Sequence, residues 1–289
     1  MVIIGAGAIG VEFAYFYHTL GTEVTIVELQ KTLVPVEDQD VGKELGKIYK
    51  KKGMNLMLES TVEKVEKKGS GVKVTVKTKK GEEVIEADVV LSAVGVTGNV
   101  EGIGLEKIGV KVERGAIVVD KSNYSTSVDG IYAIGDVAPG PMLAHKAEEE
   151  GVACVEIING QKTHMNYDNI PAIVYTNPEV ASVGKTEEQL KKEKIKYKVG
   201  KFPFMANSRA KAINETDGFV KILAEEKTDK VLGVHIIGSH AGEMIAQIAI
   251  AMEFGASSED IARTCHAHPT YSEAIKEAAL AVDKRSIHS

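Results

Sequence analysis

The spacing of apolar residues changes along the chain, whose first part contains short segments that are apolar throughout. Such segments are typical of parallel strands buried on both faces. Helical spacing over 37–52 predicts a helix that ends at Gly53. From Thr61 the pattern alternates, with a turn at Lys80-Gly81, which predicts an antiparallel meander. The expected buried strands are 1–4, 24–28, 54–58 and 87–94.

The middle of the chain begins with a glycine-rich, irregular stretch over 98–115, which suits a domain boundary. Two short buried strands are expected after it, at 116–120 and 131–134. A long helix is predicted over 142–158, because Asn159-Gly160 would end it.

The last third has the pattern of a sheet that alternates with helices. Thr186 and Gln189 form a capping pair, which predicts a helix from Glu187. The segment 241–254 is more apolar than one buried helix face requires, so we expect it to lie in a core or against another subunit. The expected strands are 170–175, 180–184, 197–204, 219–224 and 231–237.

The composition argues against some classes of partner and indicates the kind of compartment. With 289 residues, 44% of them hydrophobic, the chain is long enough for about two domains with proper cores. Its net charge of −6 argues against nucleic acid and anionic membranes, since both require a basic surface. Cys154 and Cys265 lack the spacing of metal ligands, which suits a reducing, cytosolic or matrix-like compartment. No apolar run reaches the length of a membrane span.

The turn after the first strand carries the first candidate chemistry. Gly5 permits a tight turn, Gly7 lets backbone approach a ligand, and Gly10 lets the next helix pack closely on the strand. The N–H groups of that helix would face an anion such as a pyrophosphate. Glu28 follows the second strand. In dinucleotide-binding folds a carboxylate at this position accepts hydrogen bonds from both ribose hydroxyls and repels a 2′-phosphate. The alternative is a glycine turn that binds nothing, with Glu12 a surface carboxylate.

Asp136 follows a glycine at the carboxyl end of the strand expected at 131–134. Open α/β sheets place ligand contacts at such ends. Aspartate is also common in turns, where it caps the residues that follow. Taken alone, Asp136 is therefore either a ligand contact or a turn residue.

A second constellation lies at residues 265–273, directly before a predicted helix. His268 and the carboxylate of Glu273, five residues on, can form a base and the group that orients it. Thr270 and Glu273 also match a capping box, which would explain Glu273 without any chemistry. The spacing leaves both interpretations open.

With these residues in view, the whole chain resembles the dihydrolipoamide dehydrogenase family of flavin-dependent pyridine nucleotide–disulfide oxidoreductases. The motifs that carry the resemblance are highly specific when taken together. They are Gly5-Ala-Gly-Ala-Ile-Gly-Val-Glu12, Gly130-Ile-Tyr-Ala-Ile-Gly-Asp136, Met142-Leu-Ala-His-Lys-Ala-Glu-Glu-Glu-Gly151, Ile170-Pro-Ala-Ile-Val-Tyr-Thr-Asn-Pro-Glu-Val-Ala-Ser-Val-Gly184 and His266-Ala-His-Pro-Thr-Tyr-Ser-Glu273.

The resemblance implies sites for two cofactors, NAD and FAD. Asp136 matches the residue that holds the ribityl chain of the flavin. His268 matches the acid/base, with Glu273 as its partner, and serves the active site of the other subunit of a homodimer. The implied NAD contacts are Gly5, Ala6, Gly7, Ala8, Ile9, Gly10, Glu28, Val62 and Gly95, and those of the flavin ring are Met142, Leu143, Ala144 and His145.

The expected fold is an α/β, Rossmann-like NAD-binding domain with a β-meander at 1–97, followed by an α+β dimerisation domain at 166–289. Residues 98–165 would be the C-terminal remnant of the FAD-binding and central domain. Met1 lies in the first strand with no lead-in, so we expect a fragment. The family's first domain, which carries its own glycine fingerprint and a redox-active Cys-x4-Cys, has no counterpart here. The segment 94–98 also lacks an arginine pair seen in many relatives.

The implied activity is reoxidation of protein-bound dihydrolipoamide by NAD+ through a disulfide and FAD, with His268 as the proton acceptor. This chain supplies the base and the NAD site but no disulfide and no metal site. The implied partners are a second copy of the chain and the lipoyl domains of 2-oxoacid dehydrogenase or glycine cleavage complexes. The expected location is the cytoplasm or, in a eukaryote, the mitochondrial matrix.

Two alternatives to this activity remain. One is a related reductase such as glutathione reductase, but such enzymes usually prefer NADPH and carry arginines after the second strand, where this chain has Glu28-Leu-Gln30. The other is a catalytically inactive fragment that binds NAD and dimerises.

Overall fold

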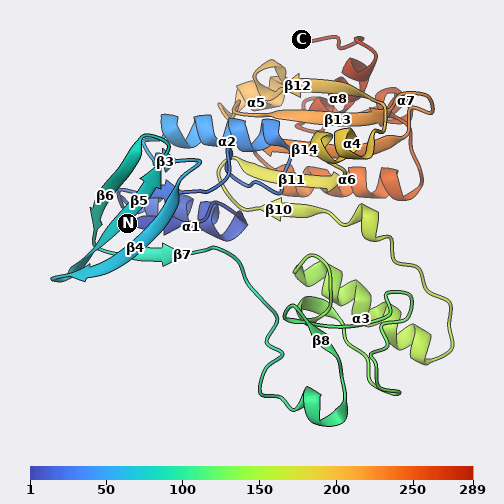
Figure 1. Cartoon of the computed structure of the whole chain (residues 1–289). Coiled ribbons are helices and arrows are strands. Elements are labelled where there is room, and N and C mark those ends of the chain that lie inside the picture. The colour runs from blue at the N-terminus through green and yellow to red at the C-terminus, as the bar shows by residue number, and fades with distance from the viewer. Residues whose placement is uncertain (289) are drawn as a thin grey trace. The chain divides into compact units, whose positions relative to one another are not determined.

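The computed structural model describes residues 1–288, and these form two compact units (Figure 1). Unit 1 combines Met1–Val94 with Pro171–Ser289, and unit 2 is Gly95–Ile170. Two segments far apart in the sequence thus fold together, with unit 2 inserted between them along the chain.

Unit 1 begins with a four-stranded parallel sheet in the order β3-β2-β1-β7. This confirms the parallel strands predicted from the short apolar segments. The elements of this part are β1 (Val2–Ile4), α1 (Ala8–Thr19), β2 (Thr25–Val27), α2 (Gln39–Lys51), β3 (Asn55–Met57) and β7 (Val90–Ser92).

The parallel sheet is covered on both faces, which explains why its strands do not alternate. Ile3 of β1 packs in a core with residues of α1 and α2. Its neighbour Val2 points to the other face, because successive strand residues alternate, and packs there against Val74 and Val76. These valines belong to the antiparallel meander β4 (Thr61–Lys68), β5 (Gly71–Thr78) and β6 (Gly81–Ala87), which confirms the predicted meander.

The second part of unit 1 is a five-stranded antiparallel sheet in the order β10-β11-β14-β13-β12, with helices packed on it. Its strands are β10 (Ala172–Val174), β11 (Glu179–Gly184), β12 (Tyr197–Pro203), β13 (Phe219–Glu225) and β14 (Val231–Gly238). Its helices are α4 (Glu187–Glu193), η4 (Phe204–Ala206), α5 (Ser208–Ala212), α6 (Ala241–Glu253), α7 (Ser258–Arg263) and α8 (Glu273–Val282).

One hydrophobic core joins the two parts of unit 1. Val220 and Ile222 of β13 pack on one face of the antiparallel sheet with side chains of α6 and α8. Phe219 and Ile237 lie in the other core, which they share with Leu45 of α2 and with the parallel sheet. Figure 1 shows α2 beside the antiparallel sheet. Burial of both faces of β13 and β14 therefore holds the segments 1–94 and 171–289 together.

Unit 2 has two small cores and little regular structure apart from one helix. The predicted strand at 116–120 is reduced to Ala116–Ile117, and 131–134 is no strand, because there Tyr132 makes a bridge only to Ser125. Ile131 and Ala133 pack in a core of this unit, although their segment forms no strand. The elements are η1 (Leu105–Ile108), β8 (Val112–Glu113), β9 (Ala116–Ile117), η2 (Gly135–Val137), α3 (Ala144–Ile158) and η3 (Tyr167–Asn169).

Candidate functional site

The glycine turn between β1 and α1 lets backbone come close to neighbouring groups. Gly5 has a φ of +95°, and a Cβ there would lie 2.5 Å from the carbonyl oxygen of Ala93. A Cβ on Gly10 would lie 2.0 Å from the carbonyl oxygen of Gly5, so glycine is needed for α1 to start this close to β1. A Cβ on Gly7 would meet no atom of the described residues within 4 Å. Of the three glycines, Gly7 is the one that faces open space.

The N-terminus of α1 has the features of an anion site. Gly7 is its N-cap residue, no side chain among residues 1–288 caps it, and its first turn carries no acidic residue. The first N–H groups of a helix have no acceptor within the helix, and the helix dipole favours negative charge there. Ala8, Ile9 and Gly10 therefore carry backbone donors where a phosphate group can approach.

Glu28 follows β2 directly, and its carboxylate is held against the glycine turn. Its Oε2 accepts a hydrogen bond from the backbone N–H of Ala6, and its Oε1 accepts one from Gln30, both at 2.7 Å. The residue is buried, with 7% of its surface exposed. Each carboxylate oxygen has a further lone pair and can still accept from a ribose hydroxyl. The two backbone bonds determine where those lone pairs point.

Three other residues discussed for the NAD site lie in different surroundings. Val62 of β4 is half-buried and packs on the core between the meander and the parallel sheet. Gly95, with a φ of +135°, is the first residue of unit 2, whereas Val62 and the glycine turn belong to unit 1. Glu12 accepts a hydrogen bond from the N–H of Tyr175 at 2.8 Å, which ties α1 to the end of β10. This bond gives Glu12 a structural role within unit 1.

The predicted flavin contacts all lie in unit 2. Asp136 is exposed and sits in the short helical turn η2. Met142 and Leu143 directly precede α3, and Ala144 and His145 are its first two residues. Except for Leu143, which is half-buried, these residues are exposed. The structure therefore leaves this group of side chains accessible within its own unit.

A buried ion pair that sequence reasoning missed holds the turn beside Asp136. Lys146 and Glu150 are one helical turn apart on α3 and only 1% and 2% exposed. The Nζ of Lys146 donates to the carbonyl oxygen of Gly135 at 3.1 Å, and Oε2 of Glu150 accepts from the N–H of Gly135 at 2.7 Å. Tyr167 donates to the other carboxylate oxygen of Glu150 at 2.9 Å. A lysine and a glutamate at i,i+4 within the motif were the available signal.

His268 and Glu273 form a hydrogen-bonded pair at the start of α8. Nδ1 of His268 lies 2.9 Å from Oε1 of Glu273. The carboxylate can only accept, so Nδ1 is assigned as the donor and Nε2 carries the lone pair of the neutral ring. The side chain of His268 is 70% exposed, so Nε2 is accessible. A histidine whose Nδ1–H is held by a carboxylate is suited to accept a proton at Nε2.

Glu273 uses its second oxygen to cap the backbone. Its Oε2 accepts from the N–H of Thr270 at 2.8 Å, whereas the hydroxyl of Thr270 donates to the carbonyl oxygen of Ala267 at 2.7 Å. The reciprocal half of the predicted capping box is therefore not formed, and Ser272 is the N-cap residue of α8. Burial acts to raise the pKa of Glu273, but the bonds from Thr270 and His268 outweigh it and the pKa is lowered. Glu273 is thus kept ionised as a partner for the histidine.

The pair lines a cavity of about 250 Å³. His266 lies on the same cavity, but its Nδ1 contacts the carbonyl oxygen of Thr264 at 3.0 Å and, within residues 1–288, no carboxylate. The two histidines of the motif are therefore not equivalent.

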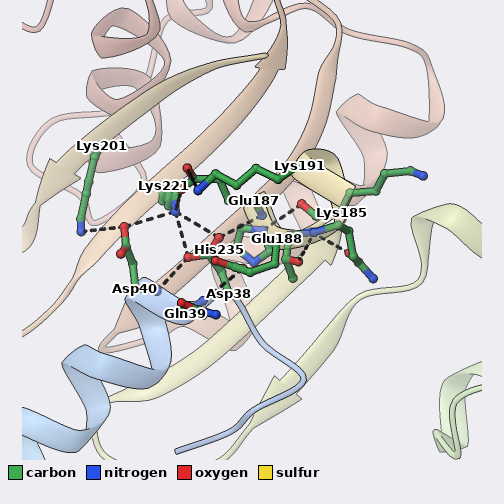
Figure 2. A network of polar contacts seen from close by, with 12 residues as sticks. Asp38, Gln39, Asp40, Lys185, Glu187, Glu188, Lys191, Lys201, Lys221 and His235 are labelled. Carbon is green, nitrogen blue, oxygen red and sulfur yellow. Dashed lines mark hydrogen bonds and ion pairs between the residues drawn. The ribbon is translucent and has the colours of Figure 1, made fainter. Parts of the chain in front are cut away.

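A buried lysine in unit 1 is another feature that sequence reasoning missed (Figure 2). Lys221 of β13 is 1% exposed, and its Nζ contacts Asp38 at 2.9 Å, Asp40 at 3.2 Å and Glu187 at 2.6 Å. These carboxylates come from the start of α2 and the start of α4, as Figure 2 shows. Burial acts to lower the pKa of Lys221, but the carboxylates outweigh it and raise the pKa. This network joins the two segments of unit 1 and is structural.

The cysteines offer no redox pair. Cys154 is buried in α3 of unit 2, where burial raises the pKa of its thiol, and Cys265 is exposed in unit 1. Both are free thiols. Within residues 1–288 no cluster of three or more histidine, cysteine, aspartate or glutamate side chains is arranged to hold a metal ion. Nor does any helix in that range combine the length and apolar character needed to cross a membrane.

Two family models match the chain. Residues 1–151 match the model described as pyridine nucleotide-disulphide oxidoreductase. Residues 170–279 match the model of the dimerisation domain of the same proteins. The match thus includes the glycine turn, Asp136 and the His268–Glu273 pair.

Curated relatives match over the whole chain. The mitochondrial dihydrolipoyl dehydrogenase of Pisum sativum is 54% identical over 100% of this chain and 58% of its own length. Dihydrolipoyl dehydrogenase of Trypanosoma brucei brucei is 50% identical over 100% of this chain and 61% of its own length. A leghemoglobin reductase of Glycine max is 54% identical over 100% of this chain and 56% of its own length. The chain therefore spans somewhat more than half the length of these relatives.

Solved structures of similar proteins confirm the fold. LpdA from Mycobacterium tuberculosis has a TM-score of 0.87 at 31% identity, covering 96% of this chain and 60% of that one. The HOCl-induced flavoprotein disulfide reductase RclA from Escherichia coli has a TM-score of 0.86 at 27% identity, covering 98% of this chain and 64% of that one. Since a family model covers more than half of the sequence, the chain belongs to the pyridine nucleotide-disulphide oxidoreductase family.

Proposed function

We propose that this chain is the C-terminal portion of a dihydrolipoyl dehydrogenase, which reoxidises protein-bound dihydrolipoamide with NAD+. The observation that carries the proposal is the His268–Glu273 pair, with Nδ1 bonded to the carboxylate at 2.9 Å and the ring accessible. An exposed imidazole oriented in this way can deprotonate a thiol, and a thiolate is the nucleophile in thiol–disulfide exchange. Relatives more than 50% identical over the whole chain carry the name of this enzyme.

The NAD site is proposed at the glycine turn. Open space at Gly7, the uncapped start of α1 and the buried carboxylate of Glu28 fit a pyrophosphate with a ribose beside it. Glu28 would accept the ribose hydroxyls and oppose a 2′-phosphate, which favours NAD over NADP. The full set of proposed NAD contacts is Gly5, Ala6, Gly7, Ala8, Ile9, Gly10, Glu28, Val62 and Gly95.

Part of an FAD site is proposed in unit 2. Asp136 would accept from hydroxyls of the ribityl chain, and its turn is fixed on both sides of Gly135 by Lys146 and Glu150. The residues at the start of α3 would lie along the flavin ring: Met142, Leu143, Ala144 and His145. When bound, FAD and NAD+ would supply the electron transfer that the side chains of this protein cannot perform.

The proposed role of the chain in the reaction is to move and hold one proton. Nε2 of His268 takes the proton of a substrate thiol, while Glu273 keeps Nδ1 protonated and stabilises the imidazolium that forms. The thiolate then attacks a disulfide, so that a mixed disulfide forms and the other sulfur of the broken S–S bond leaves as a thiolate. That disulfide would come from outside residues 1–288, because Cys154 and Cys265 are both free thiols.

The domain boundaries that we propose are 1–97 for NAD binding, 98–165 for the remnant of the FAD-binding and central domain, and 166–289 for dimerisation. The partners that we propose are a second copy of the chain and the lipoyl domains of 2-oxoacid dehydrogenase or glycine cleavage complexes. The matched dimerisation domain supports the homodimer, and Ile250 and Phe254 at the end of α6 are exposed, as expected for a subunit contact. The proposed compartment is the cytoplasm or the mitochondrial matrix, and several relatives are named as mitochondrial.

One observation favours a second candidate function. The two cysteines form no disulfide, so the chain alone could serve as an NAD-binding and dimerising module without redox activity. Adding dihydrolipoamide and NAD+ to the purified chain, and to a version carrying an upstream flavin domain, separates the two candidates. We expect NADH and flavin absorbance from the longer version and neither from the 289-residue chain. A longer version that binds flavin yet forms no NADH would contradict the proposed activity.

A further inference from the structure

The cavity of His268 contains a second histidine–carboxylate pair. Nδ1 of His288 lies 2.7 Å from Oε1 of Glu277, and both residues line the same cavity as His268 and Glu273. The two glutamates are four residues apart on α8 and so lie on the same helix face. The structure therefore places two imidazoles, each held through Nδ1 by a carboxylate of α8, around one cavity.

Glu277 anchors residues 286–288, the last described residues of the chain. Its side chain is 7% exposed, and its Oε2 accepts from the hydroxyl of Ser286 and the N–H of Ile287, each at 2.8 Å, and from the N–H of His288 at 3.4 Å. Burial acts to raise the pKa of Glu277, but the bonds from His288, Ile287 and Ser286 lower it. A buried carboxylate that accepts this many bonds holds its donors in place, because each broken bond would leave a buried charge less satisfied.

The charge of His288 affects the pKa of Glu273. A protonated His268 and a protonated His288 both lower the pKa of Glu273. The other charged or titratable groups that line this cavity are His266, Lys276 and Glu277. His288 also borders an adjoining groove, whose charged side chains are Glu44, Lys201, Lys211 and Asp217.

We infer that Glu277 is a positioning residue of the His268 site: it fixes residues 286–288 at the edge of the cavity and holds the imidazole of His288 on the cavity that His268 and Glu273 also line. The inference rests on the proposed function only for the role of His268 as the base. The arrangement itself concerns contacts within unit 1.

A protonated His288 adds to the effect of Thr270 and His268, which lower the pKa of Glu273. A positive charge near a carboxylate favours the ionised form. An ionised Glu273 holds the Nδ1–H of His268 and leaves Nε2 as the proton acceptor. His288 thus acts through Glu273 and needs no contact with a substrate.

The first test measures the pKa of Glu273 by carbon NMR of the side-chain carboxyl group, in the 289-residue chain. In His288→Asn we expect this pKa to rise by on the order of half a pH unit, the size typical of losing one solvent-exposed charge neighbour. His266→Asn is the matched control, since His266 lines the same cavity but contacts a backbone carbonyl oxygen, and we expect no change. An unchanged Glu273 pKa in His288→Asn would overturn the inference.

The second test concerns the anchor. Hydrogen exchange at the amides of Ile287 and His288 should be slow in the wild-type protein and roughly tenfold faster in Glu277→Leu. Glu277→Gln retains one acceptor oxygen and should restore part of the amide protection. Protection that persists in Glu277→Leu would contradict the anchor role. Neither readout uses turnover, so a failure of this inference is distinct from a failure of the proposed activity.

Discussion

The carboxylate of Glu28 and the backbone N–H of Ala6 are joined by a hydrogen bond of 2.7 Å, although the two residues are separated by a whole helix in the sequence. The bond places a negative charge at the glycine turn. A buried carboxylate held in this way cannot easily move aside for a second negative group. It therefore provides a physical basis for discrimination between NAD and NADP.

The first prediction follows from that charge. In Glu28→Gln, which keeps the size and one acceptor oxygen of the side chain, the preference for NADH over NADPH should fall by roughly tenfold, since opposed like charges discriminate strongly between ligands. Calorimetric titration of both cofactors measures this ratio. Glu23→Gln is the control, because Glu23 is an exposed carboxylate just before β2, the strand that Glu28 follows. It should leave the ratio unchanged. A wild-type protein that binds NADPH more tightly would refute the assignment.

The second prediction separates packing from ligand approach in the glycine turn. Gly10→Ala should lower the free energy of unfolding by about 1–3 kcal/mol, because its Cβ would meet the carbonyl oxygen of Gly5. Gly7→Ala should leave stability within about 0.5 kcal/mol of wild type, because its Cβ faces open space, but should weaken NAD binding.

Urea unfolding and calorimetry with NAD+ measure the two quantities of this second prediction. Equal losses of stability in both variants would show that Gly7 is as crowded as Gly10. Unchanged NAD affinity in Gly7→Ala would move the cofactor away from this turn.

The third prediction concerns the buried lysine. Lys221→Met should destabilise unit 1 by about 3–5 kcal/mol, because it leaves the buried Asp38 without its cation and removes one of the two lysines that pair with Glu187. Lys201→Met is the matched control, since the Lys201 side chain is 43% exposed, its ion pair with Asp40 is 3.5 Å long, and its Nζ lies 3.7 Å from the centre of the Phe219 ring. It should cost about 1 kcal/mol. Urea unfolding at neutral pH measures both. A small loss in Lys221→Met would mean that water satisfies the carboxylates.

The same network predicts a dependence of stability on pH. Burial would raise the pKa of Glu187, but Lys191, Lys221 and Tyr197 lower it from 4.5 to about 2. A group whose pKa is lower in the folded state stabilises that state above its unfolded pKa and stops doing so as the pH falls through the folded value. Wild-type stability should therefore fall between about pH 4.5 and 2, and fall less in Glu187→Gln. Identical acid profiles would exclude Glu187 as a contributor.

The fourth prediction distinguishes the two histidines of the motif. In a version that carries an upstream flavin domain, His268→Ala should reduce turnover with dihydrolipoamide by roughly 100- to 10,000-fold, the usual cost of removing a general base. His266→Ala should have a far smaller effect, because the Nδ1 of His266 contacts a backbone carbonyl oxygen, whereas that of His268 is held by a carboxylate. Steady-state rates of NADH formation provide the measurement. Equal, small losses in both variants would make the histidines purely structural.

Local patterns in the sequence were sufficient to predict the elements around the glycine turn. Continuous apolar strands, the spacing of Gly5, Gly7 and Gly10 and the position of Glu28 all depend on neighbours within about thirty residues, and the structure has strand, turn, helix and strand there. The pairing of His268 with Glu273 was also accessible, since the two are five residues apart. What each pair does was not decided by spacing, because capping and catalysis require the same residue types.

The expected strand at 131–134 shows where local pattern fails. Its apolar residues match a buried strand, but a strand forms only when another stretch of backbone pairs with it, and here Tyr132 has a single bridge to Ser125. Lys221 shows the converse. In the sequence it is one polar residue in an apolar strand, and its three carboxylate partners come from segments more than thirty residues away.

The sequence by itself determined the parallel and antiparallel sheets, the glycine turn with its acidic partner and the histidine before the last helix, because hydrophobic periodicity and short-range turn chemistry are local. Only the tertiary structure decided that residues 1–94 and 171–289 share one core, that Lys146 and Glu150 hold Gly135, and that Glu277 brings His288 to the cavity of His268. The shared core depends on contacts between distant segments. The other two features depend on which polar groups become buried together, since a buried charge must find a partner wherever the fold provides one.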